Sequence, residues 1–196
     1  ENGHIITKPA MSDCEFIEIP SIGTLEAFNT DGLRTLLFTM SHIPNMKEKT
    51  LRYPGHIQYV KALKESGFFN ENKIDIKGFQ ISPLEFTSKI LFDEWKLNED
   101  EEELTVMTVK ISGTSFDGVK RNVFYFIYDE FDKATKVSSM ARTTGYTAAA
   151  TADYILKNGF QKGVIAPEFI GSNRKFFEHL MDYLKQRNIK ISCSVQ

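Results

Sequence analysis

Hydrophobic and polar positions alternate most clearly in two segments of the second half of the chain, residues 104–112 and 119–130. Both are rich in Val, Ile, Phe and Tyr, and Asp117-Gly118 lies between them. Alternation with a period of two is typical of strands, and Asp-Gly favours a tight turn. The pattern therefore predicts an antiparallel pair. Polar residues on one side indicate that only one face is covered.

Shorter runs that are rich in β-branched and aromatic residues predict further strands. Two of them, residues 4–8 and 16–19, lie close together and are expected to form a hairpin. The other runs that predict a strand or an extended segment are 21–28, 47–53, 74–81, 137–141, 163–167 and 189–193.

Apolar residues spaced by three or four positions predict the helices. Residues 56–66 carry such a stripe, and Gly67 follows as a stop signal. Residues 82–85, Ser-Pro-Leu-Glu, form a capping box that starts a second helix. The remaining expected helices are a turn capped by Asp31 that runs to about Phe38, an alanine-rich helix that follows a threonine cap and ends at Gly159, and a last helix capped by Ser172 or Asn173.

These elements predict an α+β fold with a mixed, largely antiparallel sheet and helices packed mainly on one face. A chain of 196 residues is long enough for one well-buried domain and short for two. No internal repeat or low-complexity linker divides it. We therefore expect residues 1–196 to form a single domain.

Composition and charge exclude several classes of function. The 24 basic and 26 acidic residues nearly cancel, so nucleic acid is not an expected partner. No apolar run reaches the roughly 20 residues of a membrane-spanning helix, so no membrane partner is expected. The chain begins at Glu1 without a signal-peptide pattern, and we expect it to be a segment of a longer protein. The two cysteines, Cys14 and Cys193, lack a partner motif, which favours a reducing, cytoplasmic location.

The acidic stretch at residues 98–103 is a candidate metal site by charge alone. No His or Cys accompanies it, and consecutive carboxylates on a loop are usually solvated. We therefore expect no metal.

The richest chemistry lies in the stretch Thr50-Leu51-Arg52-Tyr53-Pro54-Gly55-His56. A strand delivers Arg52, Pro54-Gly55 breaks the chain, and His56 begins a helix. Arginine, histidine and the N–H groups of a helix start are all donors, and together they suit a carboxylate. The alternative is a strand–turn–helix corner in which these side chains are merely solvated or paired.

The same stretch resembles the C-terminal, substrate-binding domain of the saccharopine dehydrogenase-like family. Three further motifs agree with the family in order, and together they span most of the chain: Leu25-Glu-Ala-Phe with Thr30-Asp-Gly-Leu-Arg34, Ser139-Met-Ala-Arg-Thr-Thr-Gly145 and Gly163-Val-Ile-Ala-Pro167. The family includes saccharopine reductases, lysine 6-dehydrogenases and carboxynorspermidine dehydrogenases. The resemblance implies a substrate-binding and dimerisation domain similar in architecture to those of saccharopine dehydrogenase and glyceraldehyde-3-phosphate dehydrogenase-like enzymes.

The resemblance also implies an NAD or NADP cofactor. No two glycines of this chain are separated by a single residue, so the G-x-G-x-x-G fingerprint is absent. In the family, a Rossmann domain precedes the segment seen here. We expect that domain to hold the cofactor and residues 163–196 to pack against it. This chain alone is expected to be inactive.

Residues of the matching motifs are the candidate site. Carboxylates call for the planar fork of arginine, and histidine exchanges protons near neutrality. The family resemblance implies substrate binding by Arg34, Thr50, Leu51, Arg52, Gly55, Arg142 and Thr143, and catalytic roles for His56 and Tyr53. For Arg142 the alternative is that it ties two domains together.

The leading hypothesis is the substrate-binding domain of an NAD(P)-dependent oxidoreductase that acts on the C–N bond of an amino acid in lysine metabolism. Lysine 6-dehydrogenase and carboxynorspermidine dehydrogenase are the alternatives within the family, and a homodimer is expected. A different class of function is a non-catalytic ligand-binding or assembly module of the same fold.

Overall fold

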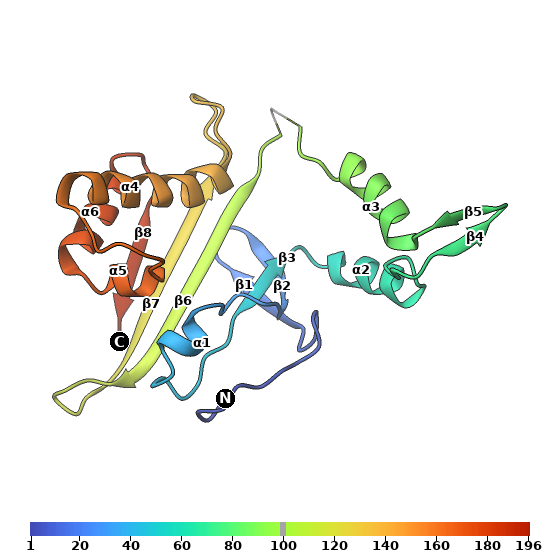
Figure 1. Ribbon diagram of the computed structural model, residues 1–196. Coiled ribbons are helices and arrows are strands. Elements are labelled where there is room, and N and C mark those ends of the chain that lie inside the picture. Colours follow the sequence, from blue (N-terminus) through green and yellow to red (C-terminus); the bar gives the residue numbers. More distant parts are fainter. Residues whose placement is uncertain (99–100) are drawn as a thin grey trace. The chain divides into compact units, whose positions relative to one another are not determined.

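A computed structural model describes residues 1–98 and 101–196 of the chain (Figure 1). The chain divides into two compact units, Glu1–Leu97 and Asn98–Gln196. The predicted acidic loop at 98–103 falls partly on residues 99 and 100, which lie outside the described residues.

The sheet of the first unit contains β1 (Glu15–Ile19), β2 (Gly23–Asn29) and β3 (Lys49–Arg52). Its order is β1-β2-β3, and both pairs are antiparallel. These strands confirm the predictions for 16–19, 21–28 and 47–53. The central strand β2 is buried from Leu25 to Phe28, because it has a neighbour on each side.

The predicted hairpin of residues 4–8 with 16–19 is wrong. Residues 4–8 form no regular strand, and β1 pairs with β2 instead. Ser21 and Gly23 both have positive φ, and the Ile22 amide donates to the Ile19 carbonyl at 3.1 Å. This tight turn brings β2 back along β1, so the strand that follows β1 becomes its partner.

The helical turn expected after Asp31 begins later than predicted. Helix α1 (Leu36–Thr39) is a single turn whose N-cap is Thr35. Arg34 has a φ of +47°, a left-handed conformation that a right-handed helix excludes. The motif residues up to Arg34 therefore form a loop.

The other helices of the first unit confirm their predicted start and stop signals. Helix α2 (His56–Glu65) ends just before Gly67, whose φ is +85°. Helix α3 (Pro83–Glu94) is capped by Ser82, whose hydroxyl accepts from the Glu85 amide at 3.4 Å. The strand predicted at 74–81 is a hairpin of β4 (Ile74–Ile76) and β5 (Phe79–Ile81), because Lys77 and Gly78 both take positive φ and turn the chain.

The sheet of the second unit is built on the two strands that the sequence marks most clearly. Strands β6 (Leu104–Thr114) and β7 (Lys120–Glu130) pair antiparallel over their whole length, from Leu104↔Glu130 to Thr114↔Lys120. The C-terminal strand β8 (Ile191–Val195) joins the other edge of β7 and confirms the last predicted strand. In the described residues, every pairing within the sheets is antiparallel, and the strands form three sheets instead of one.

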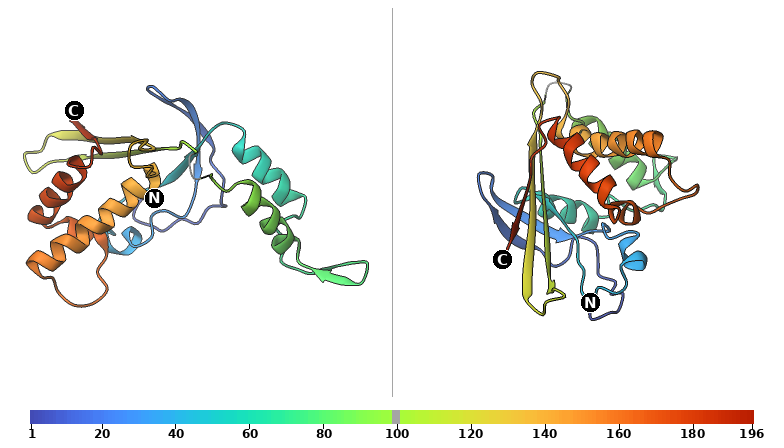
Figure 2. Two further views of the ribbon diagram at one scale, coloured as in Figure 1. Left: turned by 90° about the horizontal axis from the view of Figure 1, so that it is seen from above. Right: turned by 90° about the vertical axis from the view of Figure 1, so that its left-hand side faces the viewer.

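The helices of the second unit cover one face of this sheet (Figure 2). They are α4 (Tyr146–Asn158), α5 (Pro167–Gly171) and α6 (Arg174–Lys185), preceded by the π-helical turn η1 (Ala141–Gly145). Tyr154, Ile170 and Phe176 form their buried core. The Ser139 hydroxyl bonds that of Thr105 on β6 at 2.5 Å, and this contact marks the covered face. The α+β class with helices on one face is therefore confirmed.

Two local predictions for this unit are wrong. No threonine caps α4: Thr143, Thr147 and Thr151 each donate back to the carbonyl four residues earlier, so η1 continues directly into the helix. Residues 163–167 form no strand but lead into α5, which starts at Pro167, because proline fits the first turn of a helix. Residues 137–141 contribute a single bridge, Asp132↔Val137, before η1 begins. As predicted, Asn173 caps α6, and its side chain accepts from the Phe176 amide at 3.2 Å.

Within the described parts of the chain, every helix is too short or too polar to cross a lipid bilayer.

Candidate functional site

The candidate site of the first unit is organised by a tight turn between β3 and α2. The His56 amide donates to the Tyr53 carbonyl at 3.3 Å, with Pro54 and Gly55 between them. Gly55 has φ +97° and ψ −26°, the geometry of the third residue of a type II turn. Proline followed by glycine is the sequence signature of this turn. The local sequence thereby places Arg52 at a strand end and His56 at a helix start.

Arg52 lies at the exposed end of β3, and most of its donors are free. One guanidinium nitrogen donates to the carbonyl of Leu51 at 2.8 Å. Among the described residues this is the only hydrogen bond of its side chain, and it forms no ion pair. Arginine carries five N–H donors in a planar fork. Arg52 therefore retains the donors that a bidentate carboxylate requires.

His56 is half-buried directly after the turn. Burial lowers the pKa of its imidazole below the ordinary value of 6.5, and the positive charge of Arg52 lowers it further. The carboxylate of Glu26 opposes both effects and raises that pKa. The ring of Trp95 lies 6.2 Å away, centroid to centroid. His56 is therefore a neutral imidazole near neutral pH and is able to accept a proton.

Thr50 connects the strand to the loop that carries Arg34. Its hydroxyl lies 2.8 Å from the hydroxyl of Thr30, which also donates to Glu48 at 2.6 Å. Arg34 is exposed, with an ion pair to Asp31 at 3.4 Å. An exposed pair of this kind contributes little stability and is easily exchanged. The loop thus presents a second cation from the same unit.

Arg142 is placed very differently, because it is buried in the second unit among carboxylates. Its guanidinium makes a two-pronged contact with Asp129, at 2.9 and 3.1 Å, and donates to Asp132 at 3.0 Å. A fourth hydrogen bond goes to the Arg187 carbonyl at 3.0 Å. Arg142 and Asp129 are each 6% exposed. A substrate carboxylate would have to displace these partners, and the binding role of Arg142 stays a prediction.

Thr143 is also engaged within its own helix. Its hydroxyl donates to the Ser139 carbonyl at 2.9 Å. Arg142 therefore ties η1 to the sheet of the second unit, and Thr143 bonds within its own helical segment. The other seven predicted residues lie in the first unit.

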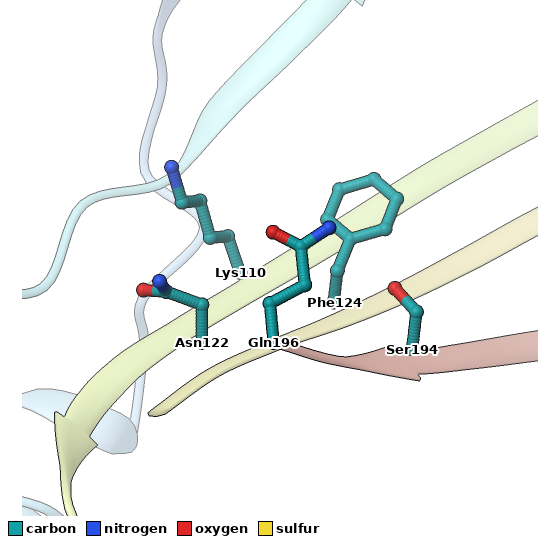
Figure 3. Close-up of a pocket in the computed structure, with 5 residues that line it drawn as sticks. All are labelled: Lys110, Asn122, Phe124, Ser194 and Gln196. Atoms are coloured by element: carbon teal, nitrogen blue, oxygen red, sulfur yellow. The ribbon is translucent and has the colours of Figure 1, made fainter. Parts of the chain in front are cut away.

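The second unit has a shallow hollow of about 280 Å³ on the face of β6, β7 and β8 opposite the helices (Figure 3). Its lining residues stand on that face side by side: Lys110, Asn122, Phe124, Ser194 and Gln196. Lys110 is the one charged residue among them. The hollow contains none of the residues predicted from the sequence and no acid–base pair.

Sequence reasoning missed two residues that the structure places in charged clusters, Glu26 and Asp129. Glu26 is the one carboxylate of β2, and Asp129 stands directly after the aromatic run of β7, before Glu130. Both are buried, at 7% and 6% exposure. A charged residue inside a hydrophobic strand was the available signal, because burial of a carboxylate requires a nearby cation or donor.

The residues of this chain do not fit a dinucleotide. Phosphate binding in dinucleotide sites needs closely spaced glycines between a strand and a helix, and no glycines of this sequence have that spacing. The chain's own groups are instead exposed cationic donors, a neutral imidazole and a buried carboxylate. Fold and candidate site together define an α+β domain that exposes cationic donors.

Comparison with known proteins places this domain in a family. The family model of the saccharopine dehydrogenase C-terminal domain matches residues 1–189, and the chain belongs to this family.

A solved structure shares the fold. The apo, histidine-tagged saccharopine dehydrogenase (L-Glu forming) from Saccharomyces cerevisiae superimposes with a TM-score of 0.71 at 19% sequence identity. The match covers 95% of this chain and 55% of the yeast chain. The chain thus spans about half the length of that enzyme.

Proposed function

We propose that this chain is the substrate-binding domain of an NAD(P)-dependent oxidoreductase that acts on the C–N bond of an amino acid. The observation that carries the proposal is the Arg52–His56 turn. It presents a guanidinium with free donors beside a neutral imidazole, in a domain of the saccharopine dehydrogenase family. Carboxylate recognition and proton handling are the two tasks that such an enzyme leaves to its substrate domain.

Carboxylate recognition and proton handling fall to different side chains in this proposal. Arg52 binds a substrate carboxylate through its fork, and Arg34 binds a second carboxylate where the substrate has one. Thr50 and Leu51 hold these cations in place, and Gly55 shapes the turn. His56 accepts the proton that the substrate nitrogen releases, and the exposed Tyr53 orients the substrate.

NAD or NADP supplies the hydride chemistry when it is bound. In this proposal the nucleotide is held by a Rossmann domain outside this chain, and residues 163–196 pack against that domain. The enzyme works in lysine metabolism in the cytoplasm. Lysine 6-dehydrogenase and carboxynorspermidine dehydrogenase are the alternative activities of the same site.

The test is nicotinamide absorbance with the full-length protein that contains this chain. Lysine, saccharopine and carboxynorspermidine are supplied in turn, with NAD and NADP separately. We expect turnover with one of them, and R52Q to raise KM by about tenfold or more through loss of a charged hydrogen bond. K64Q, a change at an exposed cation in the last turn of α2, is the matched control and should leave KM unchanged.

Two outcomes contradict the proposal. Melting shifts with these amino acids but no turnover would show a non-catalytic ligand-binding module. If neither a melting shift nor turnover were observed, the domain would instead serve as an assembly module.

We also propose that the parent protein is a homodimer. The helices leave part of the sheet face that they pack on exposed. Four apolar residues of β6 and β8 lie on this exposed part: Met107, Val109, Ile111 and Val195, at 46%, 39%, 53% and 59% exposure. These four residues are called the apolar patch here, and exposed apolar patches are typical of subunit interfaces. A second copy that applies the same patch would bury both, as two-fold symmetry requires.

A further inference from the structure

The first unit contains a buried carboxylic acid residue, Glu26, to which the proposed function assigns no role. Glu26 lies in the central strand β2 and is 7% exposed. Among the described residues, its carboxylate accepts no hydrogen bond and forms no ion pair within 4.0 Å. Although the side chain is largely buried, neither carboxylate oxygen is among the fully enclosed, unpartnered atoms of the described residues, so both can still accept from a ligand donor.

Glu26 and Arg52 are direct neighbours on one face of the sheet. They are cross-strand partners in the β2–β3 register, which places their Cβ atoms about 5 Å apart. Arg52 nevertheless donates to the carbonyl of Leu51 and not to Glu26. An anion and a cation therefore lie side by side with most of their hydrogen-bonding capacity unused.

The two cross-strand neighbours of Glu26 on this face of the sheet are both exposed. The other cross-strand neighbour of Glu26 is Phe16 on β1, which is 66% exposed, and Arg52 is exposed as well. Glu26 is thus a buried residue that lies between two exposed side chains on the same face of the sheet. The charges of Arg52 and Glu26 both act on the pKa of His56, so His56 lies near this pair of side chains.

We propose that Glu26 is the acceptor for the ammonium group of the substrate, so that Glu26 and Arg52 together recognise the zwitterionic end of an α-amino acid. In such an end a carboxylate and an ammonium flank one carbon, a spacing that suits neighbouring residues on adjacent strands. Glu26 gains the cationic donor that the chain does not provide, and Arg52 gains the carboxylate. This assignment rests on the proposed function and narrows its substrate class to ligands with a free α-amino-acid end.

The experiment removes one charge from the ligand and one from the protein. Calorimetric titration of the full-length protein compares L-lysine with 6-aminohexanoate, which lacks the α-ammonium, and with cadaverine, which lacks the carboxylate. We expect wild type to prefer L-lysine over 6-aminohexanoate by about tenfold or more, the effect of one charged hydrogen bond. E26Q should abolish this preference, and R52Q should instead abolish the preference over cadaverine.

Two further variants, and a comparison of two ligands in E26Q, distinguish a binding role of Glu26 from a purely structural effect of the substitution. E26D keeps the charge and should retain part of the preference. E18Q makes the same chemical change on the neighbouring strand β1, at a carboxylate hydrogen-bonded to Thr24, and should retain all of it. Equal weakening of L-lysine and 6-aminohexanoate in E26Q would show that Glu26 merely positions Arg52 and would overturn the assignment.

The two proposals fail in different ways. Binding and turnover of L-lysine with an unchanged preference in E26Q would overturn the role of Glu26 alone. Absence of amino-acid binding by the wild-type protein would overturn the proposed function and this assignment together.

Discussion

Arg52 and Arg142 show that the surroundings of a residue decide its chemistry. Both are arginines in motifs of the family, and the resemblance implies substrate binding for both, with a tie between domains as the alternative for Arg142. One uses a single donor on its own backbone, and the other makes four hydrogen bonds inside a buried cluster. Donor occupancy therefore favours Arg52 as a ligand-binding group and Arg142 as a stabilising one.

Substitution of Arg142 should destabilise the second unit strongly. R142M would leave Asp129 buried without its partner, and breaking a buried pair in this way costs about 3–5 kcal/mol. The hydrogen bonds to Asp129 raise the pKa of the guanidinium, in agreement with a tightly held charge. Urea unfolding measures the loss. R174Q removes an exposed helix pair with Glu178 and should cost less than about 0.5 kcal/mol. An R142M variant as stable as R174Q would contradict the structural role.

His56 should make the fold sensitive to mild acid. The folded chain holds the pKa of His56 below its ordinary value of 6.5, mainly through burial. As the pH falls, the unfolded chain therefore binds this proton before the folded chain does. The contribution of His56 to the free energy of unfolding is fully present above about pH 6.5 and is lost as the pH falls below that value.

The variant H56Q removes this titration. Its stability should decrease less than that of wild type between about pH 7 and about pH 5, because glutamine does not ionise. Chemical unfolding at a series of pH values provides the measurement. H4Q, at an exposed histidine, should follow the wild-type curve. Parallel curves for wild type and H56Q would show that the histidine is not held in its neutral form.

At the scale of elements, the strand–turn–helix of β3 and α2 is the unit that builds the site. Its geometry depends on Gly55, whose φ of +97° is unfavourable for any residue with a Cβ atom. A Cβ at this position would meet nothing closer than a Tyr59 ring carbon at 3.9 Å. The requirement for glycine is therefore conformational and not steric.

The variant G55A tests this requirement. We expect it to destabilise the fold by about 1–2 kcal/mol, because alanine must adopt a left-handed conformation there. Thermal and urea unfolding measure the change. G113A is the control, since Gly113 lies within β6 without a positive φ and has open space around its Cβ position. Equal stability of G55A and G113A would mean that the turn does not require glycine. The displaced His56 should also raise KM in the full-length protein.

At the scale of the whole molecule, the family match spans both units. It covers residues 1–189, while β8 begins at Ile191, so the third strand of the second sheet lies beyond the matched segment. The site residues of the first unit and the β6 residues of the apolar patch lie within the matched segment, while Val195 of that patch lies beyond it. The apolar patch of the second unit is the surface on which the proposed dimer depends.

In the proposed dimer Ile111 lies in the interface, so a substitution there should weaken self-association. I111K places a charge in the apolar patch, and burial of an unpaired charge should weaken self-association by at least about tenfold. Light scattering coupled to size-exclusion chromatography, over a range of concentrations, reports the molar mass. T108K introduces the same charge on the opposite face of β6 and should leave the dimer intact. A monomeric wild type, or a dimer insensitive to I111K, would overturn this assembly.

Much of the fold and part of the site were predictable because their causes are local. The β6–β7 hairpin follows from alternation and Asp117-Gly118, and α2 follows from its apolar stripe and Gly67. Errors occurred where a local signal competed with a neighbour. Residues 4–8 have strand propensity but no partner strand, and the threonines after Arg142 bond backward along the helix instead of capping it.

The sequence by itself determined the α+β class, the turn that joins Arg52 to His56, and the family. The first two depend on dihedral preferences and periodicity, which act over a few residues, whereas the family follows from the resemblance of four motifs in order along the chain. Only the tertiary structure decided which charges are satisfied. It paired Arg142 with Asp129, left most donors of Arg52 free, and set Glu26 beside Arg52 across two strands. Whether a charge is buried, paired or free depends on contacts between residues distant in sequence, and the fold alone creates those contacts.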